Sequence, residues 1–107
     1  MFLVTDQLIQ EMTDIIVREV NPLKLVLFGS HARGDARPGS DLDFLVIEDG
    51  PFDADKRRED EMVKLWELLF DYPVPIDFLV YSPDEVERWQ DAPNHVVAHA
   101  LKDGRVL

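Results

Sequence analysis

The chain of 107 residues contains no cysteine. This absence excludes disulfide bonds, thiolate metal ligands and a cysteine nucleophile, and it is typical of proteins from a reducing compartment. We therefore expect a cytoplasmic protein.

Long apolar runs are also absent, since none approaches the roughly 20 residues that a membrane-spanning helix needs. The first segment, MFLVTDQLIQEM, has neither a basic start nor a small-residue cleavage site, so we expect no signal peptide and no membrane association. The length fits one compact domain over residues 1–107, and a hydrophobic content of 46% provides for a core.

Basic residues are scarce: 11 lysines and arginines face 22 acidic residues, for a formal net charge of −11. Affinity for nucleic acid rests largely on lysine and arginine, so the balance argues against direct binding of DNA or RNA. A basic protein partner, or a phosphate ligand that arrives with metal ions, is easier to accommodate. Improved solubility explains the acidity equally well.

Apolar residues at helical spacing predict a first helix over residues 5–20, with Thr5 or Asp6 as N-cap and a stop at Asn21-Pro22. The other expected elements are strands at 23–28, 41–48 and 74–82, a helix after the charged run 53–61, a helix capped by Ser82 with Pro83 and Glu85, and a last helix at about 94–102 before Gly104. This order predicts an α/β (α+β) fold with a small mixed sheet of three to four strands flanked by helices.

The connections predict which strand ends meet. More than 20 residues with a helix join the second and third strands, which suits a parallel, right-handed crossover. Only 12 residues join the first and second strands, so we expect these two to pair antiparallel. The end of the first strand, Gly29-Ser30, then shares a rim with Asp41 and Asp43 of the second and Asp77 of the third.

Asp41 and Asp43 lie two apart on a strand, so their side chains point to one face. Two carboxylates at about 4 Å repel by roughly 4 kcal/mol at an effective dielectric of 20, unless water or a cation separates them. Asp77 would add a third carboxylate, although one aspartate on a strand can also pair with an arginine. Three hard oxygen ligands with no histidine or cysteine close in sequence favour Mg²⁺ or Mn²⁺ over zinc.

Gly29 and Ser30 are candidates for a phosphate cradle. A glycine lets the backbone approach a ligand, and Ser30 offers a hydroxyl and an N–H at the start of the short segment SHARG. Such donors opposite three carboxylates would suit a metal-bound nucleoside triphosphate.

The spacing of Gly29-Ser30, Asp41-Leu42-Asp43 and a later Asp77 resembles the signature of the nucleotidyltransferase superfamily related to DNA polymerase beta. The wording GSHARGDARPGSDLDFLV and the ending ALKDGRVL resemble more narrowly the minimal nucleotidyltransferases, antitoxin-type proteins often paired with a HEPN-domain RNase toxin. The resemblance covers nearly the whole chain.

The resemblance implies a nucleotidyltransferase fold and a role for each motif residue. Gly29 and Ser30 would bind the triphosphate, Asp41 and Asp43 would bind two Mg²⁺ ions, and Asp77 would complete the second metal site and help to activate an attacking hydroxyl. The implied reaction transfers AMP from ATP to a protein hydroxyl, often a tyrosine of the partner toxin. The second domain of larger relatives is missing, so a partner or a second copy in a homo-oligomer would have to supply those surfaces.

Two other functions stay open. An acidic antitoxin could neutralise a basic RNase by binding alone, although a pure binder has no need of rim carboxylates. A nucleotidyltransferase acting on small molecules of the aminoglycoside type is disfavoured, because the chain has no substrate domain.

Several side chains near the motif have alternative roles. Arg33 and Arg37 could contact phosphates or pair with Asp35 or Asp41, and we list Arg33 among the candidate nucleotide-binding residues. His31 is expected to be a solvated loop residue, although it could also touch the triphosphate.

The two tryptophans and the two remaining histidines lie outside the motif. His95 and His99 are four apart on a helix, but no zinc motif surrounds them, so a surface or packing role is expected. Trp66 is expected in the core, and Trp89 is expected to be the more exposed, as a candidate partner contact.

Overall fold

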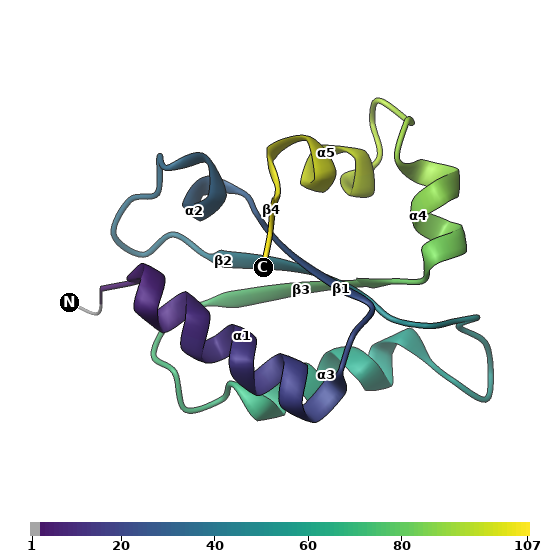
Figure 1. Cartoon of the computed structure of the whole chain (residues 1–107), viewed down its shortest axis with the longest axis horizontal. Coiled ribbons are helices and arrows are strands. Elements are labelled where there is room, and N and C mark those ends of the chain that lie inside the picture. The colour runs from purple at the N-terminus through teal and green to yellow at the C-terminus, as the bar shows by residue number, and fades with distance from the viewer. Residues whose placement is uncertain (1–2) are drawn as a thin grey trace.

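The computed structural model describes residues 3–107 and shows a four-stranded mixed sheet with helices on both faces (Figure 1). This confirms the expected fold class. In chain order the elements are α1 (Asp6–Val20), β1 (Lys24–Phe28), α2 (Ser30–Arg33), β2 (Leu42–Ile47), α3 (Arg58–Leu68), β3 (Ile76–Tyr81), α4 (Pro83–Trp89), α5 (Val96–Asp103) and β4 (Arg105–Val106).

The sheet has the order β3-β2-β1-β4. β1 pairs antiparallel with β2, and β2 pairs parallel with β3 across the crossover that contains α3, as the connection lengths predicted. β4 pairs antiparallel with the other side of β1. Sequence reasoning missed β4, because two residues carry no periodic pattern.

Helix caps follow the sequence closely. The hydroxyl of Thr5 accepts the backbone N–H of Leu8 at the start of α1, and Asn21 ends that helix in the left-handed conformation. Ser82 begins α4 with the predicted capping box, in which its side chain accepts from the N–H of Glu85 while the Glu85 carboxylate accepts from the N–H of Ser82.

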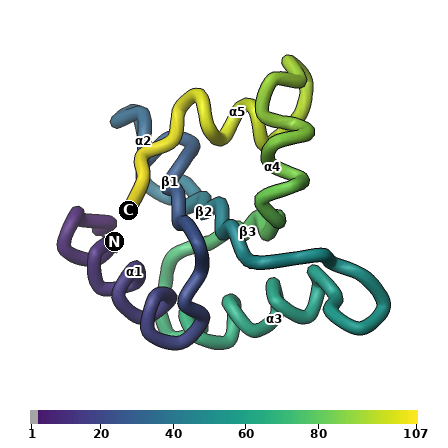
Figure 2. The backbone as a smooth tube through the Cα atoms, turned by 45° about the vertical axis from the view of Figure 1, so that its right-hand side comes forward, coloured from purple at the N-terminus to yellow at the C-terminus, as the bar shows by residue number. Residues whose placement is uncertain are grey.

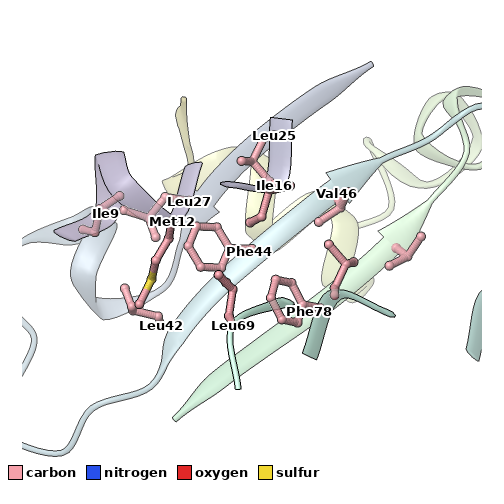
Figure 3. Packing of buried hydrophobic residues seen from close by; sticks show 12 residues of the cluster. Ile9, Met12, Ile16, Leu25, Leu27, Leu42, Phe44, Val46, Leu69 and Phe78 are labelled. Atoms are coloured by element: carbon pink, nitrogen blue, oxygen red, sulfur yellow. The ribbon is translucent and has the colours of Figure 1, made fainter. Parts of the chain in front are cut away.

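The sheet separates two apolar layers. α1 and α3 cover one face, and α2, α4 and α5 lie over the other (Figures 1 and 2). The larger cluster lies under α1 and α3, where the rings of Phe44 and Phe78 stack with centroids 5.7 Å apart (Figure 3). Val26, Leu45 and Ala100 are buried in the smaller cluster on the opposite face.

Trp66 corrects one expectation. Leu65 and Leu69 of the expected apolar stripe are buried, whereas Trp66 is 49% exposed. One residue along a helix turns the side chain by about 100°, which places Trp66 beside the core rather than in it. Its indole Nε1 donates to the carbonyl oxygen of Ile76 on β3 at 3.2 Å.

Arg58 contacts the same strand further along. It donates to the carbonyl oxygen of Val80 at 2.7 Å and forms an ion pair with Glu85, 2.6 Å between Nη2 and Oε2. Two side chains of the α3 segment therefore bind backbone oxygens of β3, the strand at one edge of the sheet.

Gly104 also differs from its expected role. The predicted left-handed residue after the last helix is extended, with φ −73° and ψ 149°. A β-carbon there would lie 2.4 Å from both the Ala100 carbonyl oxygen and Val26 Cγ1. The glycine is therefore needed for close packing, which lets the chain turn from α5 into β4.

Near the far end of β2, one buried oxygen of each of two carboxylates lacks a hydrogen-bond partner in the described part of the chain. Glu48 is 8% exposed, and one oxygen each of Glu48 and Glu61 is buried with no partner among residues 3–107. Burial, and then the charge of Glu61, raises the pKa of Glu48, while Lys56 and Lys64 oppose the shift. This pair lies at the end of β2 opposite to the predicted rim.

None of the helices in the described part of the chain has the length and hydropathy needed to cross a bilayer.

Candidate active site

The predicted rim exists in the structure. Strand pairing sets Phe28, the last residue of β1, opposite Asp43, and sets Asp43 opposite Asp77 on β3. Asp41 precedes β2 directly, and the backbone N–H of Leu42 donates to the carbonyl oxygen of Pro75 at 2.9 Å. The end of β1 and the starts of β2 and β3 therefore meet at the same end of the sheet, which is the predicted rim.

Asp41, Asp43 and Asp77 converge at this edge. Each offers a carboxylate oxygen, and the three oxygens lie within 4.8 Å of one another. Asp43 is half-buried, and the other two are exposed. The geometry brings together the three carboxylates chosen from sequence, and their role as ligands stays a prediction.

The carboxylates disfavour one another's charged forms. Burial, followed by the charges of Asp77 and Asp41, raises the pKa of Asp43 to about 6, although His31 and Arg33 pull it down. Burial and the adjacent Asp41 carboxylate also raise the pKa of Asp77. Negative charge in this cluster is therefore undercompensated by the protein itself.

A divalent cation fits this donor set. Within residues 3–107 none of the three aspartates forms a salt bridge, so no side chain occupies the position of a counterion. Three carboxylates without histidine or cysteine are the ligands preferred by Mg²⁺ and Mn²⁺. The described part of the chain holds no second group of three metal-ligating side chains.

Gly29 is adapted to the same carboxylates. Its backbone has φ 77° and ψ −158°, a region open essentially to glycine alone. A β-carbon at this position would lie 2.2 Å from Asp43 Oδ2. The glycine therefore lets the end of β1 reach the carboxylate directly, and the chain then enters α2 at Ser30.

Arg33 lies in α2 and is held by two acidic residues. Its Nε is 3.2 Å from Asp35, and its Nη1 is 3.3 Å from Asp103 of α5. Of the two roles open to it from sequence, the structure shows the ion pair with Asp35, which stiffens the loop, and nucleotide binding by Arg33 stays a prediction. Sequence reasoning missed Asp103, because no local signal links residues 70 positions apart.

In the described part of the chain, Arg37 and His31 are not held by ion pairs as Arg33 is. Arg37 forms no salt bridge within residues 3–107, so it is the less constrained of the two loop arginines. His31 was expected to be solvated but is half-buried in α2, with Nε2 3.4 Å from the carbonyl oxygen of Ser40. Packing of α2 against the loop before β2 explains this difference.

His95 and Trp89 lie away from this edge. His95 caps α5 by accepting the N–H of Val97, and its ring stacks on Trp89 with centroids 4.6 Å apart. These contacts agree with the packing role expected for the histidine. Trp89 is 36% exposed, less than the 49% of Trp66, so the expected order of the two tryptophans is reversed.

Comparison with curated proteins gives relatives whose names describe nucleotide transfer. A protein of Methanocaldococcus jannaschii named "Putative protein adenylyltransferase" is 35% identical over 85 residues, which cover 78% of this chain and 76% of that protein. A bifunctional uridylyltransferase/uridylyl-removing enzyme of Xanthomonas oryzae pv. oryzae is 32% identical over 102 residues. That match covers 95% of this chain but spans only 11% of the much longer relative.

Two solved structures share the fold. A "putative nucleotidyltransferase" from Sulfolobus solfataricus superposes with a TM-score of 0.57 at 25% identity, covering 77% of this chain and 70% of the other. A structure described as "the toxin-antitoxin with AMP-PNP" superposes with a TM-score of 0.56, covering 91% of this chain and 69% of the other. Its identity of 17% supports likeness of fold alone.

The nucleotidyltransferase domain model matches residues 9–75, well over half of the chain. The match contains Gly29, Ser30, Asp41 and Asp43 and ends two residues before Asp77. This chain belongs to the nucleotidyltransferase domain family.

Proposed function

We propose that the protein transfers AMP from ATP to a hydroxyl group of a partner protein. The observation that carries the proposal is the convergence of three carboxylate oxygens within 4.8 Å, beside a glycine at which a β-carbon would lie 2.2 Å from the Asp43 carboxylate. A protein that only binds a partner has no need of three carboxylates gathered at this rim.

The side chains divide the work by position. Asp41 and Asp43 would hold Mg²⁺, and Gly29 and Ser30 would bind the triphosphate. Bound Mg²⁺ supplies charge stabilisation for the attacking and leaving oxygens of an in-line displacement. Asp77 lies on the edge strand β3, and β2 separates it from Gly29. It would complete the set of metal ligands. It would also orient the acceptor hydroxyl on the side of the α-phosphate opposite to the leaving pyrophosphate.

A protein acceptor is supported by the archaeal relative, whose name describes transfer of adenylate to protein. Residues 1–107 would form one domain that presents its rim directly to that partner. The narrower resemblance to minimal nucleotidyltransferases favours a HEPN-domain toxin as partner, a tyrosine as acceptor and an antitoxin role. The fold shared with a toxin–antitoxin structure is consistent with this interpretation.

Intact-mass spectrometry tests the proposal directly. The protein is mixed with the product of a neighbouring gene, Mg²⁺ and ATP, and both chains are weighed. We expect the partner to gain one or more AMP units, and expect no gain with the double variant Asp41→Ala, Asp43→Ala. A parallel reaction with UTP is informative, because several relatives are uridylyltransferases.

A second candidate is an acidic protein that neutralises a basic RNase by binding alone, and the net charge of −11 is compatible with either function. The same experiment separates the two. If wild type adds no mass and the double variant neutralises the partner as well as wild type does, the binding function is correct and the transfer proposal is wrong.

A further inference from the structure

An apolar groove of about 230 Å³ lies where the end of α3 meets the edge strand β3. Each of the seven residues that line it is apolar or aromatic. Leu69 and Phe78, which are buried members of the larger apolar cluster, form its inner wall (Figure 3). The groove is smaller than the roughly 300–1,000 Å³ of small-molecule sites, so it suits an anchoring side chain of another protein better than a separate small ligand.

Large apolar side chains are exposed beside this groove. Phe70 is 83% exposed and Trp66 is 49% exposed, and both line the groove. Val63 is also exposed one helical turn before Trp66, which extends the apolar surface along α3. Exposed apolar patches mark contact sites for other molecules, and aromatic side chains are enriched in such sites. Trp66, rather than Trp89, is therefore the better candidate for a partner contact.

Two hydrogen bonds hold the walls of the groove in place. The indole of Trp66 donates to the carbonyl oxygen of Ile76 at 3.2 Å, and the hydroxyl of Tyr72 donates to the carboxylate of Glu11 at 2.6 Å. Trp66, Tyr72 and Ile76 all line the groove. Side chains that are already ordered lose little conformational freedom when a partner packs against them, so this surface is prepared for binding.

Exposed carboxylates border the apolar surface. Glu11 accepts the hydrogen bond from Tyr72, while Glu67 and Asp71 each follow a lining residue directly. Within residues 3–107 none of these three carboxylates forms a salt bridge. In a symmetric contact between two copies of this chain, each copy would bring the same carboxylates to the interface, and the net charge of −11 adds to their repulsion. A partner with lysines or arginines around an apolar segment is complementary instead.

The groove and the carboxylate cluster lie on opposite faces of the same strand. Ile76 and Phe78 line the groove, and Asp77 between them points to the other face, because side chains alternate along a strand. β3 is an edge strand, and its first residues lie at the rim. A partner that binds the groove and continues round this edge therefore arrives at the carboxylates.

We propose that this groove binds the protein that accepts AMP, through an apolar segment of that protein flanked by lysines or arginines. The apolar side chains would pack between Trp66 and Phe70, and the basic side chains would face Glu67 and Asp71. Binding at this edge would place the acceptor beside Asp77. The inference rests on the proposed function, because it takes the bound protein to be the acceptor of the transfer.

The test measures the binding of two probes by fluorescence anisotropy. One probe is the product of the neighbouring gene, and the other is a synthetic helical peptide with leucines at positions i, i+3, i+4 and i+7 and lysines elsewhere. Phe70→Glu places a charge in the groove. Val106→Glu is its matched control, since Val106 is 61% exposed on β4 at the opposite edge of the sheet.

A second pair of variants tests the charges. Glu67→Lys combined with Asp71→Lys reverses two carboxylates four residues apart at the end of α3. Glu87→Lys combined with Asp91→Lys is the matched control, because these exposed residues have the same spacing at the end of α4, which lies over the other face. We expect the first double variant to weaken both probes and to lose most of the salt dependence of binding, and the control to keep most of it.

We expect Phe70→Glu to weaken both probes at least about tenfold and Val106→Glu to change neither. Binding through charge alone would instead become tighter in Phe70→Glu, because this variant adds a negative charge to an acidic protein. In transfer assays Phe70→Glu should raise the KM for the partner and leave the affinity for Mg²⁺-ATP unchanged. Phe70 is largely exposed, so the variant should fold, and its Tm checks this.

The outcomes separate the inference from the proposed function. If Phe70→Glu and the charge-reversal variant bind both probes as wild type does, or if wild type binds neither probe, the inference is wrong whether or not AMP is transferred. If Phe70→Glu dissociates wild-type dimers in sedimentation and leaves probe binding unchanged, the groove is a contact between copies, and the inference is wrong. If the groove variants lose the partner but wild type transfers no AMP to it, the groove binds a partner as inferred, and the proposed function alone is wrong.

Discussion

The backbone of Gly29 approaches the carboxylate of Asp43 so closely that any β-carbon at residue 29 would lie 2.2 Å from Oδ2. Two residues 14 positions apart are thus fitted to each other at the edge where β1 and β2 pair. The close approach joins the candidate phosphate cradle to the candidate metal ligands. A substitution at either residue should therefore change the position of the other.

Gly29→Ala should therefore damage both stability and ligand binding. The backbone strain alone costs about 1–3 kcal/mol, and the clash with Asp43 adds to it. Urea unfolding and Mg²⁺-ATP titration measure the two effects. Gly34→Ala is the control, because Gly34 has φ 85° but nothing within 4 Å of a β-carbon, so it should lose stability and keep ATP affinity.

Asp43→Asn should separate folding from ligand binding. In wild type, Mg²⁺ and ATP together should raise the Tm well beyond either alone, because ligands that bind only the folded state stabilise it. The asparagine removes repulsion from Asp41 and Asp77, so the variant should fold at least as stably but lose the joint effect of Mg²⁺ and ATP. If the variant unfolds, Asp43 is structural rather than a ligand.

Mg²⁺ affinity should depend on pH through Asp43. Its pKa of about 6 lies above the ordinary value of 3.8, so the folded protein keeps a proton that the unfolded chain has already released. The stabilisation from this group is full below about pH 4 and is lost as the pH rises through 6. Metal binding requires the charged form, so Mg²⁺ affinity should rise up to about pH 6 and then level off. Equal affinities at pH 5 and pH 7 in calorimetry would contradict this assignment.

Ser30→Ala and Asp77→Ala should act on different steps. The serine variant loses a hydroxyl but keeps the backbone donors, so nucleotide affinity should fall by about 0.5–1.5 kcal/mol, or somewhat more for a charged phosphate. The Asp77 variant should still bind nucleotide but transfer at least 10²-fold more slowly, about 2.7 kcal/mol of barrier. A fluorescent ATP analogue and transfer rates measure both. Near wild-type transfer by the Asp77 variant would remove this residue from the site.

Glu48→Gln should stabilise the protein at neutral and higher pH. The raised pKa of Glu48 means that the folded state loses stability as the pH rises through that pKa, and a neutral amide avoids the loss. The gain in unfolding free energy should be larger at pH 8 than at pH 5. Glu67→Gln, on the exposed side of α3, is the matched control and should change little at either pH. A destabilised Glu48→Gln at pH 8 would show that the buried carboxylate has a cation partner in solution.

Much of the architecture was predictable, because the signals were local. The apolar strands, the caps at Thr5 and Ser82 and the connection lengths were enough to predict the sheet pairing and the rim that gathers the aspartates. Trp66 was misplaced because a residue at the border of an apolar stripe can turn either way, and only the position of β3 decides.

The remaining features depend on contacts between distant segments. The ion pair of Arg33 with Asp103, the close packing that requires Gly104 and the short strand β4 all arise where α5 returns to β1. No local sequence pattern near Arg33, Gly104 or β4 indicates that α5 packs back against β1.

The side chains that bind β3 limit how this molecule can associate with others. An edge strand with free backbone groups invites a strand from another chain, which leads to edge-to-edge aggregation. The carbonyl oxygens of Ile76 and Val80 already accept from Trp66 and Arg58, and the carboxylate of Glu85 anchors the arginine. An incoming strand would have to displace both donors. A partner should therefore recognise this side of the molecule through side chains. At high concentration, copies of this chain should resist edge-to-edge pairing of their sheets.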